Sequence, residues 1–246
     1  MEKYPKDALF RNVLYIVLGL ALLFLLRAPI ALGMVRVGDQ FFGGKLPYSL
    51  GVADTFFQTA ILINPKVPDA WHQRARISFL QGDFDTALMQ INTQLDLHGD
   101  SFMPSYYIRG LIAGYDKKYL MAEKDFSRFL EWSPYNWAAA NDLAWIYFAQ
   151  GKFKEAADVT AKTLLTSPDN PWVLMSHAMS VYNLGDSKTA LKELLHAKEE
   201  VEKLTHAQWS RAYPGNDPAI APEGLAEFKE TVEKNIELVH SKTVTE

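Results

Sequence analysis

The 246-residue chain contains no cysteine. This excludes disulfides, metal sites built on thiolates and a lipoprotein anchor on an acylated cysteine. An excess of charge of either sign is lacking as well, since 25 Lys and Arg residues stand against 29 Asp and Glu residues. No stripe of basic residues forms on any helix that the sequence predicts. We therefore expect no nucleic-acid partner.

The sequence also lacks the patterns of a catalytic centre. Residues 43–45 have neither the spacing nor the preceding strand of a phosphate-binding loop, and no His-Glu-x-x-His motif occurs. Asp96, His98 and Asp100 lie close together, but one short loop offers too few converging ligands for a metal, so a solvated turn is favoured. We predict no catalytic residue, metal, cofactor or small-molecule substrate, and therefore no enzyme.

One long apolar run lies near the N-terminus. Residues 13–26 carry no charge, and extension back to Ala8 reaches the roughly 20 residues that span a bilayer, with Arg11 at the headgroups. We predict a single transmembrane anchor over about residues 8–28. A cleaved signal peptide is the alternative, although no Ala-x-Ala site follows the run. A buried soluble helix is less favoured, because a helix that is apolar all round needs protein on every side.

Basic residues on the two sides of this run bear on its orientation. Lys3, Lys6 and Arg11 precede or begin it, whereas Arg27, Arg36 and Lys45 follow it. The positive-inside rule then favours, by a small margin, a cytoplasmic N-terminus. The remaining chain is expected on the non-cytoplasmic side, in a periplasm if the chain is bacterial.

The rest of the chain repeats with a period of about 34 residues. Equivalent positions hold Trp71, Tyr106, Ala140 and Leu174, and sixteen residues later stand Ala87, Ala122, Ala156 and Ala190. Five residues before these alanines come Gly82, Gly151 and Gly185, with Lys117 in the unit that lacks the glycine, and Pro134 and Pro168 close two units. A degenerate earlier unit has Ala53, Phe57, Ala60 and Pro65 in matching places. Over roughly residues 34–204 the chain resembles the tetratricopeptide repeat (TPR) family.

The resemblance implies two amphipathic helices in each unit, separated by the glycine turn. First helices are expected at 71–81, 106–115 and 140–150, with a small residue at each centre (Ala75, Gly110, Ala144, and Ala178 in the next unit) so that a partner helix can approach closely. Because one pair cannot bury its apolar face alone, stacked pairs form a solenoid. We predict an all-α TPR solenoid with an N-terminal transmembrane helix and a C-terminal capping helix.

Three parts are expected along the chain. Residues 1–33 form the tail and anchor, residues 34–204 form one degenerate and four fuller repeats, and residues 205–246 form the C-terminal part. Within that last part we expect a loop over 206–222 that ends in a helix over 223–240, whose apolar residues recur at helical spacing. This helix would hide the apolar face of the last repeat.

In TPR proteins the first helices line a concave face that binds extended peptides or partner helices. Carried over by position, this implies a partner-binding groove made by His72, Gln73, Arg76, Phe79, Tyr107, Leu111, Asn141, Asp142, Trp145, Phe148, Trp172 and Tyr182. Met175 and Met179 belong to the same face. Trp145 is the first candidate anchor, and packing between repeats is the alternative interpretation for any single aromatic residue.

The resemblance and the apolar run together predict a membrane-anchored scaffold for other proteins. The first hypothesis is a subunit or assembly factor of a membrane protein complex. The alternative is a chaperone-like receptor that binds client peptides at the membrane, for example in secretion or in cytochrome or photosystem assembly. Replacing Trp145 and Tyr107 together by Ala is expected to remove partner capture while the array stays folded.

Overall fold

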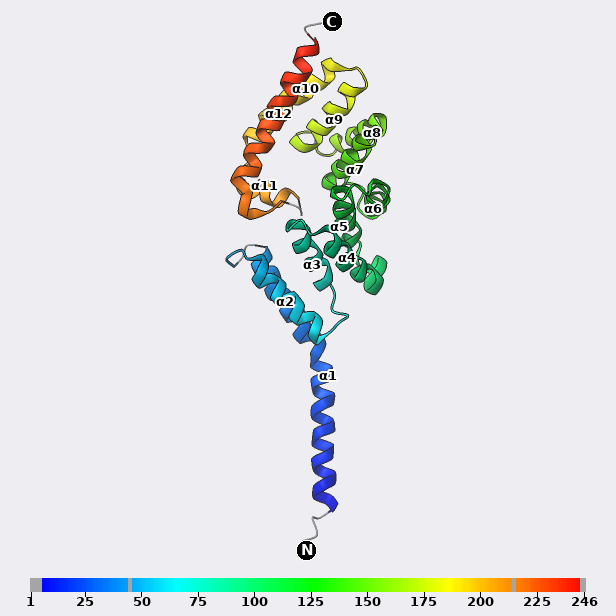
Figure 1. The fold of residues 1–246 in the computed structure, drawn as a ribbon, viewed down its shortest axis with the longest axis vertical. Helices are drawn as coiled ribbons and strands as arrows, with labels where there is room; N and C mark the ends of the chain where they lie inside the picture. The colour runs from blue at the N-terminus through cyan, green and yellow to red at the C-terminus, as the bar shows by residue number, and fades with distance from the viewer. Residues whose placement is uncertain (1–5, 44–45, 214–215, 244–246) are drawn as a thin grey trace. The chain divides into compact units, whose positions relative to one another are not determined.

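The computed structural model describes residues 6–43, 46–213 and 216–243. Every regular element among these residues is a helix, which confirms the all-α prediction. The α-helices are α1 (Lys6–Phe42), α2 (Leu50–Ile63), α3 (Ala70–Leu80), α4 (Phe84–His98), α5 (Pro104–Tyr115), α6 (Tyr119–Trp132), α7 (Trp137–Ala149), α8 (Phe153–Leu164), α9 (Pro171–Asn183), α10 (Ser187–Glu202), α11 (His206–Ala212) and α12 (Ala221–Thr243); the 3-10 helices are η1 (Gly99–Phe102) and η2 (Pro218–Ile220). The chain divides into two compact units, Met1–Arg74 and Ala75–Glu246 (Figure 1). The three-part division inferred from the sequence stays a prediction.

In the first unit, α1 is a continuous helix of 37 residues that runs through Pro29. Its most apolar 18-residue window has a mean hydropathy of 2.4, and none of that window is buried. A helix of this length and composition can cross a membrane, since about 20 residues suffice. A signal sequence near the N-terminus has the same properties.

The C-terminal part of α1 packs against α2, beside which it lies in Figure 1. The rings of Phe41 and Phe56 stack with their centroids 5.8 Å apart. Phe57 lies over Gly38 so closely that a Cβ at Gly38 would be 2.6 Å from the ring. The apolar helix therefore ends in a small packed hairpin, whereas the stretch before it is left exposed.

In the second unit, successive helices form antiparallel hairpins whose turns match the repeat pattern. Gly82, Gly151 and Gly185 have φ angles of 77°, 73° and 97°, the left-handed conformation in which glycine ends a helix at little steric cost. Lys117, which stands at the equivalent turn position, adopts φ 59°. The fold therefore imposes the glycine conformation even where a side chain opposes it.

The alanines of the repeat pattern are the contact points between helices. Fully buried are Ala53 and Ala60 of the degenerate unit, Ala75 and Ala178 of the first helices, and Ala87, Ala122, Ala156 and Ala190 of the second helices. The predicted packing role is thereby confirmed. The predicted helix starts were late, because Pro104 occupies the first turn of α5 and Asn136 caps α7 by accepting the N–H of Ala139 at 2.9 Å.

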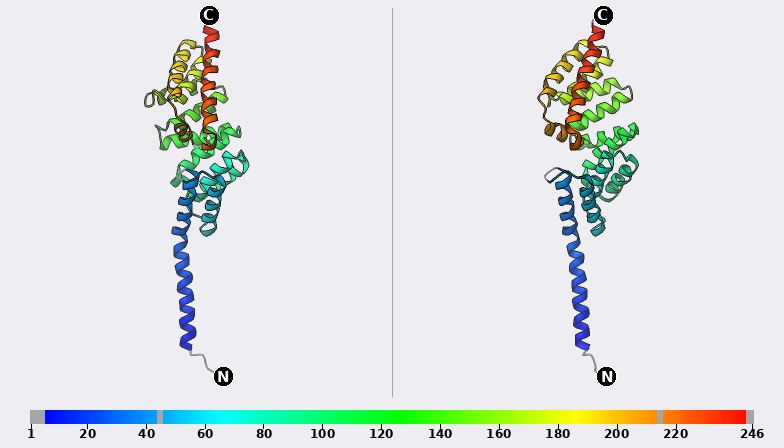
Figure 2. Two further views of the ribbon diagram at one scale, coloured as in Figure 1. Left: turned by 90° about the vertical axis from the view of Figure 1, so that its left-hand side faces the viewer. Right: turned by 60° about the vertical axis from the view of Figure 1, so that its left-hand side comes forward.

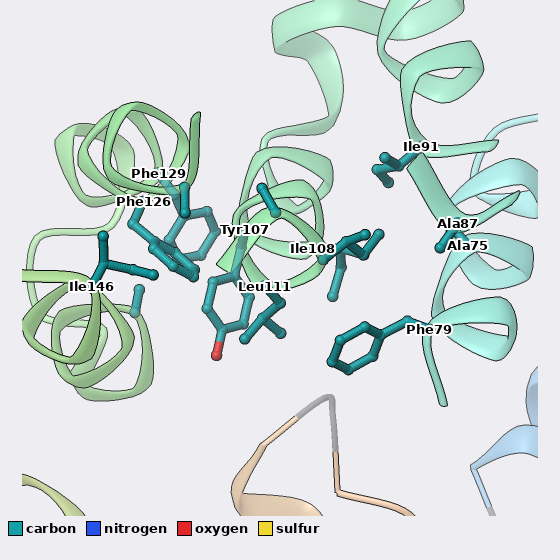
Figure 3. Packing of buried hydrophobic residues seen from close by; sticks show 14 of the residues in the cluster. Ala75, Phe79, Ala87, Ile91, Tyr107, Ile108, Leu111, Phe126, Phe129 and Ile146 are labelled. Atoms are coloured by element: carbon teal, nitrogen blue, oxygen red, sulfur yellow. The ribbon is translucent and has the colours of Figure 1, made fainter. Parts of the chain in front are cut away.

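The core of the second unit forms where α4, α5, α6 and α7 meet. Figure 3 shows Tyr107 of α5 between Leu111 and the rings of Phe126 and Phe129. The Tyr107 and Phe129 rings stack with their centroids 5.2 Å apart, and Tyr107 is only 6% exposed. Burial of each such ring stabilises the fold by roughly 2–3 kcal/mol. Tyr107 is thus a core residue as well as a residue of the predicted groove.

The C-terminal segment differs from the predicted loop over 206–222. It contains α11, which begins with a capping box in which Thr205 and Gln208 satisfy each other's backbone N–H groups. Asn216 then donates from Nδ2 to the carbonyl of Trp209 at 2.7 Å. The loop prediction was wrong at α11, because these local hydrogen bonds stabilise a helix too short to show apolar periodicity.

The predicted capping helix is confirmed as α12, which lies beside α10 in both views of Figure 2 and also contacts α9. Leu225 and Val232 pack against Leu174 and Val201, and Val239 packs against Leu194. At its start, Gly224 faces the Trp209 ring so closely that any Cβ there would overlap it. The helix hides the apolar face of the last hairpin and holds α11 in place.

Candidate functional site

A cavity of about 440 Å³ opens among the first helices of three successive hairpins and the C-terminal segment. Helices α5, α7 and α9 contribute one side, and the chain from α11 to α12 contributes the other. The lining residues are Leu111, Tyr115, Asn141, Asp142, Trp145, Trp172, Met175, Ser176, Trp209, Tyr213, Asn216, Ile220, Gly224, Glu227, Phe228 and Thr231. Its volume lies in the range of sites that hold small ligands or peptide side chains.

Five of the groove residues predicted from the sequence lie together in this wall: Leu111, Asn141, Asp142, Trp145 and Trp172. Trp145 and Met175 also line a neighbouring cavity of about 240 Å³, to which Phe148 contributes. The structure thus groups the predicted residues of α7 with Trp172 of α9. Whether they contact a partner stays a prediction.

The other predicted residues lie elsewhere. Gln73, in the first unit, donates to Asp39 at 2.8 Å, and its neighbour His72 is buried. Phe79 packs against the ring of Tyr115 at 5.2 Å. Arg76 and Phe79 of α3 and Tyr182 of α9 are not among the residues that line either cavity, and Tyr182 lies beneath the Lys242 ammonium at 5.0 Å.

Aromatic rings join the two sides of the larger cavity. Trp172 of α9 stacks on Phe228 of α12 at 4.9 Å and on Trp137 of α7 at 5.5 Å. Tyr213 meets the edges of both tryptophans, at 5.2 Å from Trp137 and 5.9 Å from Trp172. Such pairs contribute roughly 0.5–1.5 kcal/mol each beyond their area. The C-terminal segment is therefore part of the wall of the groove.

One carboxyl group lies in this aromatic surrounding. Asp142 is 8% exposed and accepts a hydrogen bond at Oδ2 from the hydroxyl of Tyr107 at 2.6 Å. Burial raises the pKa of Asp142 from 3.8 to about 7, against the lowering effect of the Tyr107 hydrogen bond. Burial, followed by the negative charge of Asp142, raises the pKa of Tyr107 and of Tyr213 well above the usual value.

Sequence reasoning missed the half of the cavity that the C-terminal segment supplies. Trp209, Tyr213 and Asn216 lie in the predicted loop, and Glu227 and Phe228 lie on the predicted cap. Two large aromatic residues in a stretch otherwise rich in polar residues and proline were the available signal, because such residues are usually buried against something. The sequence did not indicate what they would be buried against.

The described residues include one group that could be mistaken for a metal site, formed by Asp169, His196 and Glu200. His196 Nε2 lies 3.1 Å from Asp169 and 3.7 Å from Glu200, but the Lys203 ammonium already pairs with Glu200 at 2.6 Å. An ammonium bound to a ligand oxygen competes with a metal ion, so we assign no metal there. The solvated turn predicted around Asp96, His98 and Asp100 is instead the end of α4 and the start of η1. Asp100 pairs there with Arg128 at 2.5 Å.

Comparison with known proteins agrees with this architecture. A family model described as tetratricopeptide repeat matches residues 56–89. A search of curated proteins finds none that matches.

Several solved structures resemble the chain. They include MamA (17% identity over 70% of this chain and 92% of that one, TM-score 0.58) and YrrB, described as a TPR protein with an unusual peptide-binding site (14%, 70% and 87%, TM-score 0.58). PilW, described as a widely conserved type IV pilus biogenesis factor, is 18% identical over 85% of this chain and 93% of its own, with a TM-score of 0.64. At these identities the likeness shows the fold that the chains share.

Proposed function

We propose that this chain, which has the tetratricopeptide-repeat fold, is a membrane-anchored scaffold that binds another protein, as a subunit or assembly factor of a membrane protein complex. The observation that carries the proposal is that the chain combines an apolar helix, whose most apolar stretch is exposed, with an aromatic groove. The YrrB likeness supports binding of a peptide segment, and the PilW likeness supports a role in assembling a larger structure.

The anchor part of the proposal rests on the exposure of α1. Soluble proteins rarely leave a large contiguous apolar surface in water, and nearly every large side chain from Leu9 to Ile30 is exposed in this chain. Membrane lipid would cover that surface. The helix can lie in lipid because it satisfies its own backbone hydrogen bonds. We propose that α1 stays attached as a single span with the repeats on the non-cytoplasmic side.

The missing cysteines allow a direct test of this topology. Asp158→Cys places one thiol on an exposed side chain of α8, so a membrane-impermeant maleimide should label it in intact cells without permeabilisation. A thiol at Leu18 in α1 serves as the protected control. Labelling of position 158 only after the membrane is opened would place the repeats in the cytoplasm, and a mature chain that lacks α1 would show that α1 is a signal sequence.

The partner-binding part is tested by photo-crosslinking of the full chain in its native membrane. A photoreactive phenylalanine at Trp145 or Trp172 reports the groove, and one at Asp158 reports an exposed surface outside both cavities. We expect one partner to crosslink from the groove positions. A spread of many partners would favour the client receptor. Adducts from position 158 alone would overturn the groove as the binding surface.

Because Tyr107 is buried, the double replacement of Trp145 and Tyr107 is not a clean test of partner binding. Tyr107→Ala would open a hole in the core and remove the hydrogen bond to Asp142, which costs about 3–5 kcal/mol. The double replacement of Trp145 and Tyr107 therefore tests stability as well as binding. Trp145→Ala alone, with Asp158→Ala as the matched surface control, separates the two.

A further inference from the structure

The described wall of the larger cavity contains acidic and aromatic side chains. Its carboxyl groups come from Asp142 on α7 and Glu227 on α12, and six of its sixteen lining residues are aromatic. No Lys, Arg or His occurs among the described residues that line it. A site with this wall is complementary to a positive charge.

Asp142 is the central feature of that wall. A carboxyl group that is 92% buried is normally paired with a cation or bound by several donors. Among the described residues, Asp142 accepts one hydrogen bond, from Tyr107, and forms no ion pair. The carboxyl lines the cavity, so a cation that enters can pair with it. The side chain of the adjacent Asn141 lies beside the Tyr213 hydroxyl, and its buried Oδ1 has no hydrogen-bond partner among the described residues, which adds a second acceptor.

The aromatic residues of the wall favour a guanidinium over an ammonium as the bound cation. Trp145 contacts the ring of Tyr115 at 5.2 Å, and Trp172 lies in the stack with Phe228. Tryptophan rings attract cations, and the planar guanidinium of arginine both stacks on such rings and sheds its water more readily than an ammonium. Its five donors can serve Asp142 and Asn141 together, whereas the compact lysine ammonium offers three.

We propose that this cavity binds an arginine side chain of the partner segment, with the guanidinium paired to Asp142 and packed against Trp145. The inference rests on the proposed function, because it specifies what the groove recognises in the protein that it holds. We choose this occupant because the positive guanidinium is complementary in charge to the acidic wall of the cavity. The cavity of about 440 Å³ also has room for the aliphatic stem of the arginine and part of the partner backbone.

This pairing should depend on pH. In the empty cavity, burial raises the pKa of Asp142 to about 7, so an arriving arginine must displace a proton below that pH. The titratable groups that interact with Asp142 are Tyr107 and Tyr115 on α5 and Tyr213, and Glu227 lines the same cavity. His177 of α9 is engaged by Glu193 at 2.7 Å and does not line the cavity. Preference for arginine should therefore weaken between pH 7.5 and pH 5.5.

The test uses full-length protein in detergent and immobilised 12-residue peptide pools. Each pool has mixed flanking residues and one fixed central residue: arginine, lysine, citrulline, leucine or glutamate. Citrulline keeps the shape of arginine without its charge. We expect the arginine pool to retain the protein about tenfold more than the citrulline pool at pH 7.5, the usual effect of a charged hydrogen-bonded pair.

The Asp142→Asn variant should lose that preference, because Asn keeps the shape and the Tyr107 hydrogen bond but not the charge. Asp158→Asn removes the same charge from the exposed surface of α8 and should retain the preference. If the Asp142 variant fails to fold by circular dichroism, Trp145→Leu provides the second test and should also reduce the preference.

Three outcomes overturn the proposal. They are equal retention by the arginine and citrulline pools, equal retention by the arginine and lysine pools, and a preference that persists in folded Asp142→Asn protein. Groove crosslinks to a membrane partner would still support the scaffold function in each of these cases. No retention by any pool, together with no groove crosslinks, would overturn the proposed function as well.

Discussion

Replacement of Asp142 by Asn should stabilise the protein, and the gain should grow with pH. In the folded chain, burial raises the pKa of Asp142 from 3.8 to about 7. The folded state therefore holds a proton that the unfolded state has released, so stability falls as pH rises from about 4 to about 7 and changes no further above that. The pKa is about three units higher in the folded chain, and each unit corresponds to roughly 1.4 kcal/mol of stability. The stability lost between pH 4 and pH 7 is therefore about 4 kcal/mol.

Asn is neutral in both states and still accepts the hydrogen bond of Tyr107, so the variant lacks this loss. Its stability relative to the parent should be nearly unchanged at pH 4 and about 4 kcal/mol higher at pH 8. The assay is urea unfolding of the full chain in detergent, followed by tryptophan fluorescence, because three tryptophans line the cavity.

Asp158→Asn is the matched control. The hydrogen bond from Lys154 lowers the pKa of the Asp158 carboxyl, so this position stabilises the fold at neutral pH and loses that effect as pH falls. The free energy of unfolding relative to the parent should therefore rise with pH for Asp142→Asn and fall with pH for Asp158→Asn. A difference for Asp142→Asn that stays flat from pH 4 to pH 8 would mean that the carboxyl ionises normally, and would refute the argument from burial.

Four further variants test the packing of the array by thermal unfolding. Lys117→Gly should stabilise it by about 1 kcal/mol, because glycine removes the strain of φ 59°; destabilisation would refute this. Asp125→Ala should cost about 3 kcal/mol, since Asp125 is 1% exposed and binds Arg109 through two hydrogen bonds of 2.7 and 2.8 Å; a loss below 1 kcal/mol would contradict it. Gln94→Leu should stabilise by about 1–3 kcal/mol, because neither atom of the buried amide has a partner among the described residues. Gln90→Leu, which breaks the 2.9 Å bond from Ser78, should do the reverse.

Repetition explains why the sequence predicted the array so well. Buried alanines and turn glycines recur at fixed spacing, because each hairpin packs only on its neighbours. Local chemistry therefore sufficed to place the turns at Gly82, Gly151 and Gly185. The same register placed Lys117 at the equivalent turn, and the structure shows that it adopts the glycine conformation. The helix starts at Pro104 and Trp137 were less certain, because caps shift ends by two or three residues.

The candidate site could be predicted only in part. The repeat register placed Trp145 and Trp172 on first helices, and both line the cavity. The same register also selected Tyr107, which the core takes up because its ring fits between Phe126 and Phe129. Position on a helix indicates a face, whereas burial depends on which neighbours fill the space.

The helical hairpins, the apolar N-terminal helix and the capping helix could be predicted from the amino-acid sequence, because periodicity and turn chemistry act over short distances. In contrast, packing between distant segments brings Trp209 and Tyr213 back to the groove and encloses Asp142 in an aromatic cavity that has no basic side chain among its described lining residues. These contacts join residues about 70 positions apart, and no local rule links Tyr213 to Asp142. Non-local packing sets the low polarity around that carboxyl, and with it the charge that the groove is built to receive.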